Sequence, residues 1–230
     1  MHPDDPQMEP PFNPLPWVIW VMVLPMVALE AVFSAAEAGL IGGAQGIGWR
    51  VSALEQYAVW PAYWRQQWTA GALDFELLLR FVAYPFLHIN VTHAVFAVVI
   101  LLAMGKFVGD VFRPIALAAV YFISAAIGAL IYASIPAIDV PLMGAYPGDY
   151  GLIGAFTFLL WVKLAGTGAN QLRAFTMIGF LLGVQLVFGL LFGGGPEWVA
   201  DVTAFVAGFA LSFVAVPGGW QRVRARLRQR

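Results

Sequence analysis

Four ionisable side chains lie inside strongly apolar segments of the chain: Glu30, His93, Asp149 and Asp201. A second histidine, His88, lies five residues before His93, where one of these segments begins. Ionisable groups are costly inside a membrane, so residues of this kind are functional candidates. A histidine and a carboxylate on neighbouring helices can form a proton relay, a ligand site or an ordinary ion pair. The residue types alone leave these three interpretations open.

The composition indicates an integral membrane protein. Of the 230 residues, 61% are hydrophobic and 11% are charged, whereas a soluble domain has about 45–50% apolar and about 25% charged residues. A core of this size cannot hide that excess, so lipid must be the solvent for much of the surface. The chain has no cysteine and three histidines, so we expect neither a metal nor another cofactor. The net charge of -1 argues neither for nor against nucleic acid. For an integral membrane protein we expect no nucleic-acid partner.

Runs of apolar residues predict an all-α polytopic protein with six transmembrane helices. The predicted spans are Leu15–Phe33, Val91–Val108, Ile115–Ile135, Gly148–Val162, Leu172–Phe192 and Trp198–Val216. They form a single membrane domain over residues 15–216. A disordered tail (residues 1–14) precedes this domain, a basic tail (residues 217–230) follows it, and a long first loop occupies residues 35–82.

The distribution of Lys and Arg predicts the orientation, because cytoplasmic loops carry an excess of these residues. Nine of the 12 Lys and Arg residues lie on the side that the two termini share. The other three, Arg50, Arg65 and Arg80, lie in the first loop. We therefore expect cytoplasmic termini and an external first loop, in a bacterial inner membrane.

The first loop is rich in aromatic residues. Trp60, Trp64 and Trp68 recur at helical spacing, and tryptophan favours the headgroup region of a bilayer. This pattern fits either a helical hairpin half-embedded in the outer leaflet or a loop folded over the helix bundle. We expect Glu30 to reach the interface or to pair with this loop.

Small residues indicate where helices pack closely in lipid. The sixth span carries one every four residues, and the fourth span carries several near its start. They are Ala200, Ala204, Gly208 and Ser212 in the sixth span, and Gly148, Gly151 and Gly154 in the fourth. We infer that these two spans pack tightly together. His88, His93, Asp149 and Asp201 fall near the outer ends of the second, fourth and sixth spans, so we expect them to face one water-accessible cavity.

Several motifs in order resemble the rhomboid intramembrane serine proteases. Arg80 precedes the sequence YPFLH, which ends at His88 and is similar to the family's Arg and F-[LM]-H pattern. Residues 144–155, GAYPGDYGLIGA, are similar to the family's G-A-S-G-A-x-[FY]-G-L-[IL]-G-A helix start. Residues 200–208 are similar to its A-H-x-x-G-x-x-x-G pattern. The resemblance covers about residues 75–216 and implies the six-helix rhomboid fold, in which Arg80 has a structural role.

The departures from the family fall on its catalytic positions. In this register the nucleophilic serine falls at Tyr146, the following glycine at Pro147 and the general-base histidine at Asp201. The asparagine that donates to the oxyanion falls at Ala97, which leaves His93 as the remaining side-chain donor. We therefore assign no catalytic residue.

The resemblance then implies a rhomboid pseudoprotease that binds transmembrane clients or partner subunits without cleaving them. Its partners would be the lipid bilayer and a transmembrane helix, bound between the second and fifth spans. A residual polar pocket would contact that helix; it comprises His88, His93, Tyr146, Asp149, Tyr150 and Asp201.

Three alternatives stay open at the level of the sequence. The chain is an active serine-type endopeptidase if the family resemblance outweighs the substitutions. It is a hydrolase of another mechanism if Asp149 and Asp201 share a proton and activate water. It is a structural subunit of a membrane complex, or a carrier, if its apolar faces serve a permanent partner.

Overall fold

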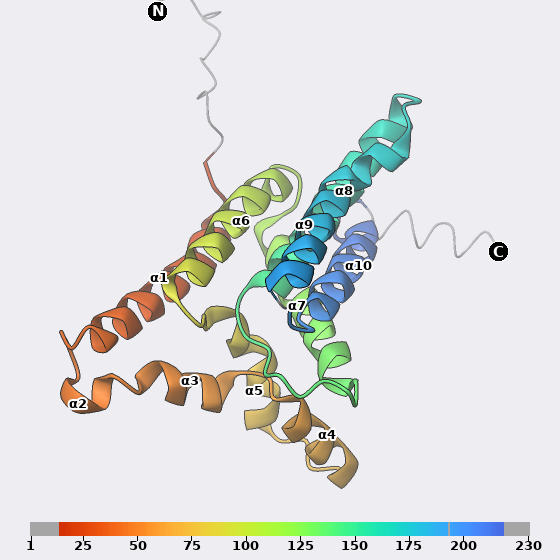
Figure 1. Ribbon diagram of the computed structural model, residues 1–230. Coiled ribbons are helices and arrows are strands. Elements are labelled where there is room, and N and C mark those ends of the chain that lie inside the picture. Colours follow the sequence, from red (N-terminus) through yellow and green to blue (C-terminus); the bar gives the residue numbers. More distant parts are fainter. Residues whose placement is uncertain (1–13, 193, 219–230) are drawn as a thin grey trace, which may run out of the picture.

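The computed structural model describes residues 14–192 and 194–218, and these residues form a helical bundle with a group of short helices at one end (Figure 1). The predicted tails at residues 1–14 and 217–230 therefore lie almost entirely outside the described residues. The elements are α1 (Trp17–Glu37), α2 (Gly43–Gly46), α3 (Trp49–Tyr57), α4 (Pro61–Ala70), α5 (Phe75–Ala83), η1 (Tyr84–Phe86), α6 (Val91–Gly109), α7 (Pro114–Ser134), α8 (Tyr146–Gly166), η2 (Gln171–Phe175), α9 (Thr176–Phe192) and α10 (Trp198–Ala215). Within these ranges no strand forms, and the prediction of an all-α chain is confirmed.

Within the described part of the chain, five helices are long and apolar enough to cross a membrane: α1, α6, α7, α8 and α10. Each overlaps a predicted span. The remaining predicted span is the fifth, Leu172–Phe192, and it corresponds to α9, whose 17 residues extend about 26 Å at the rise of an α-helix. This length is slightly below the hydrocarbon thickness of about 30 Å, so the sixth crossing stays a prediction.

Helix α8 is longer than the short fourth span predicted from the sequence, with 21 residues instead of a segment that starts at Gly148. It begins at Tyr146 because Pro147 fits the first helical turn, where its missing N–H would have no partner. Just before it, Gly144 has a φ of +92°, which favours glycine. The backbone N–H of Gly144 donates to the carbonyl of Tyr84 at 3.0 Å, and this bond ties the start of α8 to η1.

The first loop is folded into the short helices α2 to α5 and η1. Helices α4 and α5 form a hairpin that packs on α7, and the buried Trp64 meets the ring of Phe81 edge-on at 5.2 Å. An isolated antiparallel bridge joins Val59 to Leu142, in the connection between α7 and α8. The loop is therefore folded over the bundle. Its association with the outer leaflet stays a prediction, although Trp68 is exposed.

Arg80 holds this part of the fold together. Its guanidinium donates from Nη1 to the carbonyls of Glu55 and Ala58, both at 3.0 Å, and lies 5.2 Å from the centre of the Tyr63 ring. The two carbonyls are at the end of α3, so Arg80 joins α5 to α3 and to the start of α4. These contacts are those of a structural residue.

Candidate functional site

The site is built where α8 and α10 cross in backbone contact. A Cβ atom added to Gly208 would lie 1.9 Å from the carbonyl oxygen of Gly151, and one added to Gly154 would lie 2.2 Å from the carbonyl oxygen of Phe205. Glycine is therefore required at both positions for the helices to approach this closely. Gly148 faces α7 instead, where an added Cβ would lie 2.4 Å from the ring of Tyr121.

Helix α7 completes this packing against the same stripe of small residues on α10. A Cβ added to Gly128 would lie 2.6 Å from the carbonyl oxygen of Ala200 and 3.1 Å from the Cβ atom of Ala204. The small residues of α10 therefore meet glycines on both α7 and α8. The three helices fix the first turns of α8 and α10, which carry Asp149 and Asp201.

The two histidines and Tyr146 form a row of rings. The rings of His88 and His93 lie 5.1 Å apart at an angle of 84°, and the ring of Tyr146 lies 4.7 Å from that of His93. Gly144 packs against His93, since a Cβ on that glycine would lie 2.5 Å from Cε1 of the imidazole. The structure thus brings together three of the residues that the sequence singles out, from the segment before α6, from α6 and from α8.

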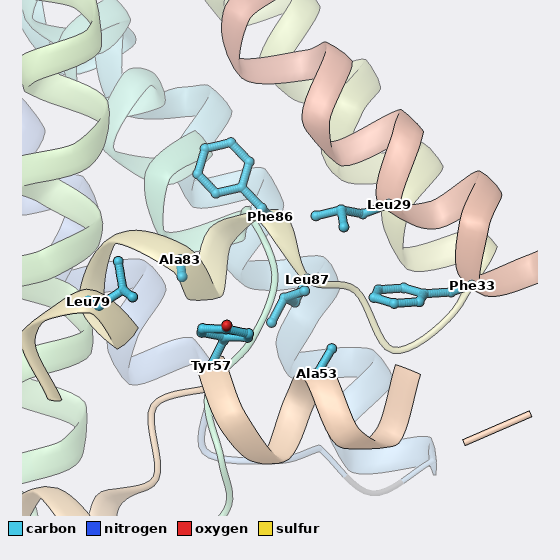
Figure 2. A pocket seen from close by; sticks show the side chains of 8 residues that line it. All are labelled: Leu29, Phe33, Ala53, Tyr57, Leu79, Ala83, Phe86 and Leu87. Atoms are coloured by element: carbon cyan, nitrogen blue, oxygen red, sulfur yellow. The ribbon is translucent and has the colours of Figure 1, made fainter. Parts of the chain in front are cut away.

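The two aspartates are buried rather than facing an open cavity. Asp149 is 0% exposed and Asp201 3% exposed. Gln185 of α9 donates from Nε2 to Oδ2 of Asp201 at 3.0 Å. Neither oxygen of Asp149 has a hydrogen-bond partner among the described residues. The pocket drawn in Figure 2 lies elsewhere, between α1 and the helices of the first loop.

Tyr84 joins η1 to α7. Its hydroxyl donates to the carbonyl of Ala125 at 2.9 Å, and its side chain is fully buried. Burial, followed by the carboxyls of Asp201 and Asp149, raises the pKa of Tyr84 well above its usual value. The tyrosine therefore stays a neutral hydrogen-bond donor at physiological pH. Neither Tyr84 nor Gln185 was predicted as a site residue, because both side chains are uncharged at neutral pH and both lie among apolar residues.

A buried ion-pair network supports the segment that carries His88. Arg50 of α3 donates to Glu30 of α1 at 2.8 Å, to Glu37 at 2.7 Å and to the carbonyl of His88 at 2.9 Å. Glu30 also accepts from Ser34 at 3.0 Å. The expectation that Glu30 pairs with the first loop is confirmed, and its partner is Arg50. The guanidinium thus joins α1, α3 and the start of α6.

His88 is held in its neutral form by its surroundings. The side chain is 1% exposed, and its ring nitrogens have no hydrogen-bond partner among the described residues. Burial lowers the pKa of His88 from 6.5 to about 4. Nearby His93 and Arg50 also lower this pKa, and Glu30 opposes them. An uncharged imidazole cannot form an ion pair, so His88 contributes polarity without charge.

This burial predicts a pH dependence of stability. Below about pH 4 both the folded and the unfolded states protonate His88. Between about pH 4 and pH 6.5 mainly the unfolded state does, so the free energy of unfolding rises with pH. We expect His88 to add about 3 kcal/mol to this rise. Thermal unfolding of the purified protein in detergent between pH 4 and pH 7 measures it. The His88→Gln variant should lose this part of the dependence, and equal slopes for the two proteins would contradict the assignment.

The chemistry open to this arrangement is limited. The described residues include no group of three or more His, Asp or Glu side chains placed to hold a metal ion. Tyr146 and His93 are partly exposed, whereas His88, Asp149 and Asp201 are buried. Of these five residues, Tyr146 and His93 are therefore the two that can contact a ligand. The arrangement therefore offers aromatic and hydrogen-bonding contacts.

Comparison with protein-family models gives a match over more than half of the chain. The search of curated proteins finds no similar sequence. The family model described as the Rhomboid domain matches residues 76–218, a range that runs from α5 to the end of α10 and contains the ring row, both aspartates and the α8–α10 crossing. This match covers more than half of the chain, in the region where the motifs of the sequence resemble the same family. The chain belongs to the rhomboid family and is an integral membrane protein.

Proposed function

We propose that this rhomboid-family protein is a pseudoprotease, which binds a transmembrane helix of a client or partner protein without cleaving it. The observation that carries the proposal is that Tyr146 and Asp201, at the positions that resemble the family's dyad, have different partners. The ring of Tyr146 packs on His93, while the carboxylate of Asp201 accepts from Gln185 of α9. Within residues 14–192 and 194–218, Tyr146 and Asp201 form no hydrogen bond with each other. The positions that resemble the family's dyad are thus engaged separately.

The chemistry of serine hydrolysis supports the same conclusion. It needs a hydroxyl nucleophile with a base within hydrogen-bond reach. The hydroxyl of Tyr146 is at the far end of a ring, and Ala97 cannot donate to an oxyanion. Removal of a single member of such a catalytic unit already removes most of the rate enhancement. Here the nucleophile, the base and one oxyanion donor all differ from the family pattern, so the serine-type endopeptidase is the weaker alternative.

An aspartyl mechanism is disfavoured by burial. Two carboxylates can share a proton and activate water, but water must then reach them. The side chain of Asp149 is fully buried and has no hydrogen bond within the described part of the chain. Its carboxyl therefore lies where a substrate peptide and a water molecule cannot both approach it.

The client helix would bind between α6 and α9, by resemblance to the family. Both helices carry large apolar side chains on their surfaces, including Phe96 and Val99 on α6 and Phe180 on α9. In this proposal α9 is the fifth of six crossings, the termini are cytoplasmic, and the membrane is a bacterial inner membrane. His93 and Tyr146 would offer polar contacts where the client helix unwinds.

Site-specific photo-cross-linking tests this binding. A photoreactive amino acid is placed at Phe96 on α6 or at Phe180 on α9, with Ile123 on the exposed face of α7 as the matched control position. The purified variants are reconstituted with a panel of synthetic transmembrane helices. We expect covalent adducts at Phe96 and Phe180 and about tenfold fewer at Ile123. Equal labelling at all three positions, or none, would contradict client binding and would favour a structural subunit.

A further inference from the structure

An apolar pocket of about 290 Å³ lies between α1 and the helices of the first loop (Figure 2). Its walls come from α1, α3, α5, η1 and the residue after η1. The lining residues are Leu29, Phe33, Ala53, Tyr57, Leu79, Ala83, Phe86 and Leu87. Tyr57 carries the one polar side-chain atom among them. The pocket is therefore a hydrocarbon-lined recess in a membrane protein.

Water does not suit this recess. A bound water molecule needs about two to four polar partners, and apolar cavities without them stay dry. If the recess were empty, its lining atoms would also lack the dispersion contacts that an occupant provides. An apolar occupant is therefore favoured over both water and vacuum.

The surroundings of the pocket identify that occupant. Leu29 and Phe33 belong to α1, a helix long and apolar enough to cross the membrane. Next to the lining residues, the side chains of Val32 on α1 and of Leu78 and Val82 on α5 are exposed and apolar. The rim of the pocket thus continues into surface for which lipid is the solvent, and the acyl chains of the bilayer are adjacent to its opening.

The N-terminal segment of the chain fits less well as an occupant, because it joins the opposite end of α1. To reach the pocket it would have to carry Asp4, Asp5 and Glu9 along the hydrocarbon region, which is costly for charged groups.

We propose that this pocket binds one acyl chain of a membrane lipid, held between α1 and the first-loop helices α3 and α5. The chain lies against Phe86 and Leu87, the residues that lead into His88. At the α1 wall it contacts Phe33, whose ring lies 5.3 Å below the guanidinium carbon of Arg50. The bound chain therefore supports the same segment that Arg50 holds through the carbonyl of His88. The proposal is independent of client binding.

Photolabelling with a lipid tests the proposal. The purified protein in detergent micelles is mixed with a small amount of phosphatidylcholine that carries a diazirine in the middle of one acyl chain. Irradiation, proteolysis and mass spectrometry then locate the label. We expect peptides that contain Tyr57, Leu79 or Phe86 to carry about ten times the label of the exposed α7 face around Ile123. Label spread evenly over the apolar surface would overturn the proposal.

Two variants fill the pocket from different walls. Ala53→Phe fills it from α3 and Ala83→Phe from α5, and each should lower the pocket label about tenfold. Ala103→Phe, on the exposed surface of α6, is the matched control and should label like the natural chain. Added lipid should also raise the unfolding temperature of the natural chain and of the control, and not of the filled variants. If either folded, filled variant keeps its full pocket label, the acyl chain binds elsewhere. If neither variant folds, the distribution of the label over the peptides of the natural chain tests the proposal without them.

Discussion

Gly208→Leu is expected to destabilise the folded protein by at least about 4 kcal/mol, beyond the range of an ordinary substitution. A Cβ atom at this position would lie 1.9 Å from the carbonyl oxygen of Gly151 and 2.6 Å from its carbonyl carbon. Both are backbone atoms of α8, so relief requires the two helices to separate. Separation removes the close packing that holds helices together in lipid and disorders the turns that carry Asp149 and Asp201. Thermal unfolding in detergent measures the loss of stability. The fraction of protein that stays monodisperse is recorded beside it.

Gly179→Leu is the matched control for this prediction. Gly179 lies in α9, and a Cβ added there meets nothing within 4 Å. We expect the free energy of unfolding of this variant to lie within about 0.5 kcal/mol of that of the natural protein, as is usual for surface substitutions. Equal destabilisation by the two leucines would show that the α8–α10 contact is not a principal source of stability.

Arg50→Met is expected to cost about 3–5 kcal/mol, the range found when one partner of a buried ion pair is removed. The side chains of Arg50 and Glu30 are 6% and 11% exposed, so the variant leaves a carboxylate in the interior without its cation. It also leaves the carbonyl of His88 without the donor that it has in the natural protein. The free energy of unfolding, measured in the same detergent at pH 7, gives the cost.

Two further variants show that the cost comes from Glu30. The double variant Arg50→Met/Glu30→Gln removes the buried carboxylate of Glu30 that lacks a cation, so part of the lost stability should return. Glu37→Gln changes the other carboxylate partner, whose side chain is 44% exposed, and should cost at most about 1 kcal/mol. If Glu37→Gln were as damaging as Arg50→Met, the exposed pair rather than the buried one would hold α3 against α1.

The elements that depend on local chemistry could be predicted from the sequence. Apolar runs located α1, α6, α7, α8 and α10, since the length of a spanning helix is set by the bilayer. The stripe of small residues that contains Gly208 indicated that the fourth and sixth spans pack together, and the structure places that residue on Gly151. The extra length of α8 was not predicted, because the predicted span starts after Pro147, although the first turn of a helix accepts proline.

The partners of buried polar groups could not be predicted. Glu30 and Arg50 are 20 residues apart, and their meeting depends on how α3 folds back on α1. The same holds for Gln185, which reaches Asp201 from a helix whose apolar pattern gave no reason to single it out. Periodicity places a residue on a face of its own helix, but the neighbouring face is decided by the tertiary packing.

A cleavage assay tests the pseudoprotease proposal most directly. The purified protein is reconstituted with a panel of fluorescent transmembrane substrates, beside the variant Tyr146→Ser/Pro147→Gly/Asp201→His. Its matched control carries Tyr146→Ala in place of Tyr146→Ser, and so lacks a nucleophile. We predict no cleavage by the natural protein or the control, and cleavage by the serine variant. Cleavage by the natural protein that the single change Asp201→Asn abolishes would contradict the proposal and would make this chain an enzyme with a different mechanism.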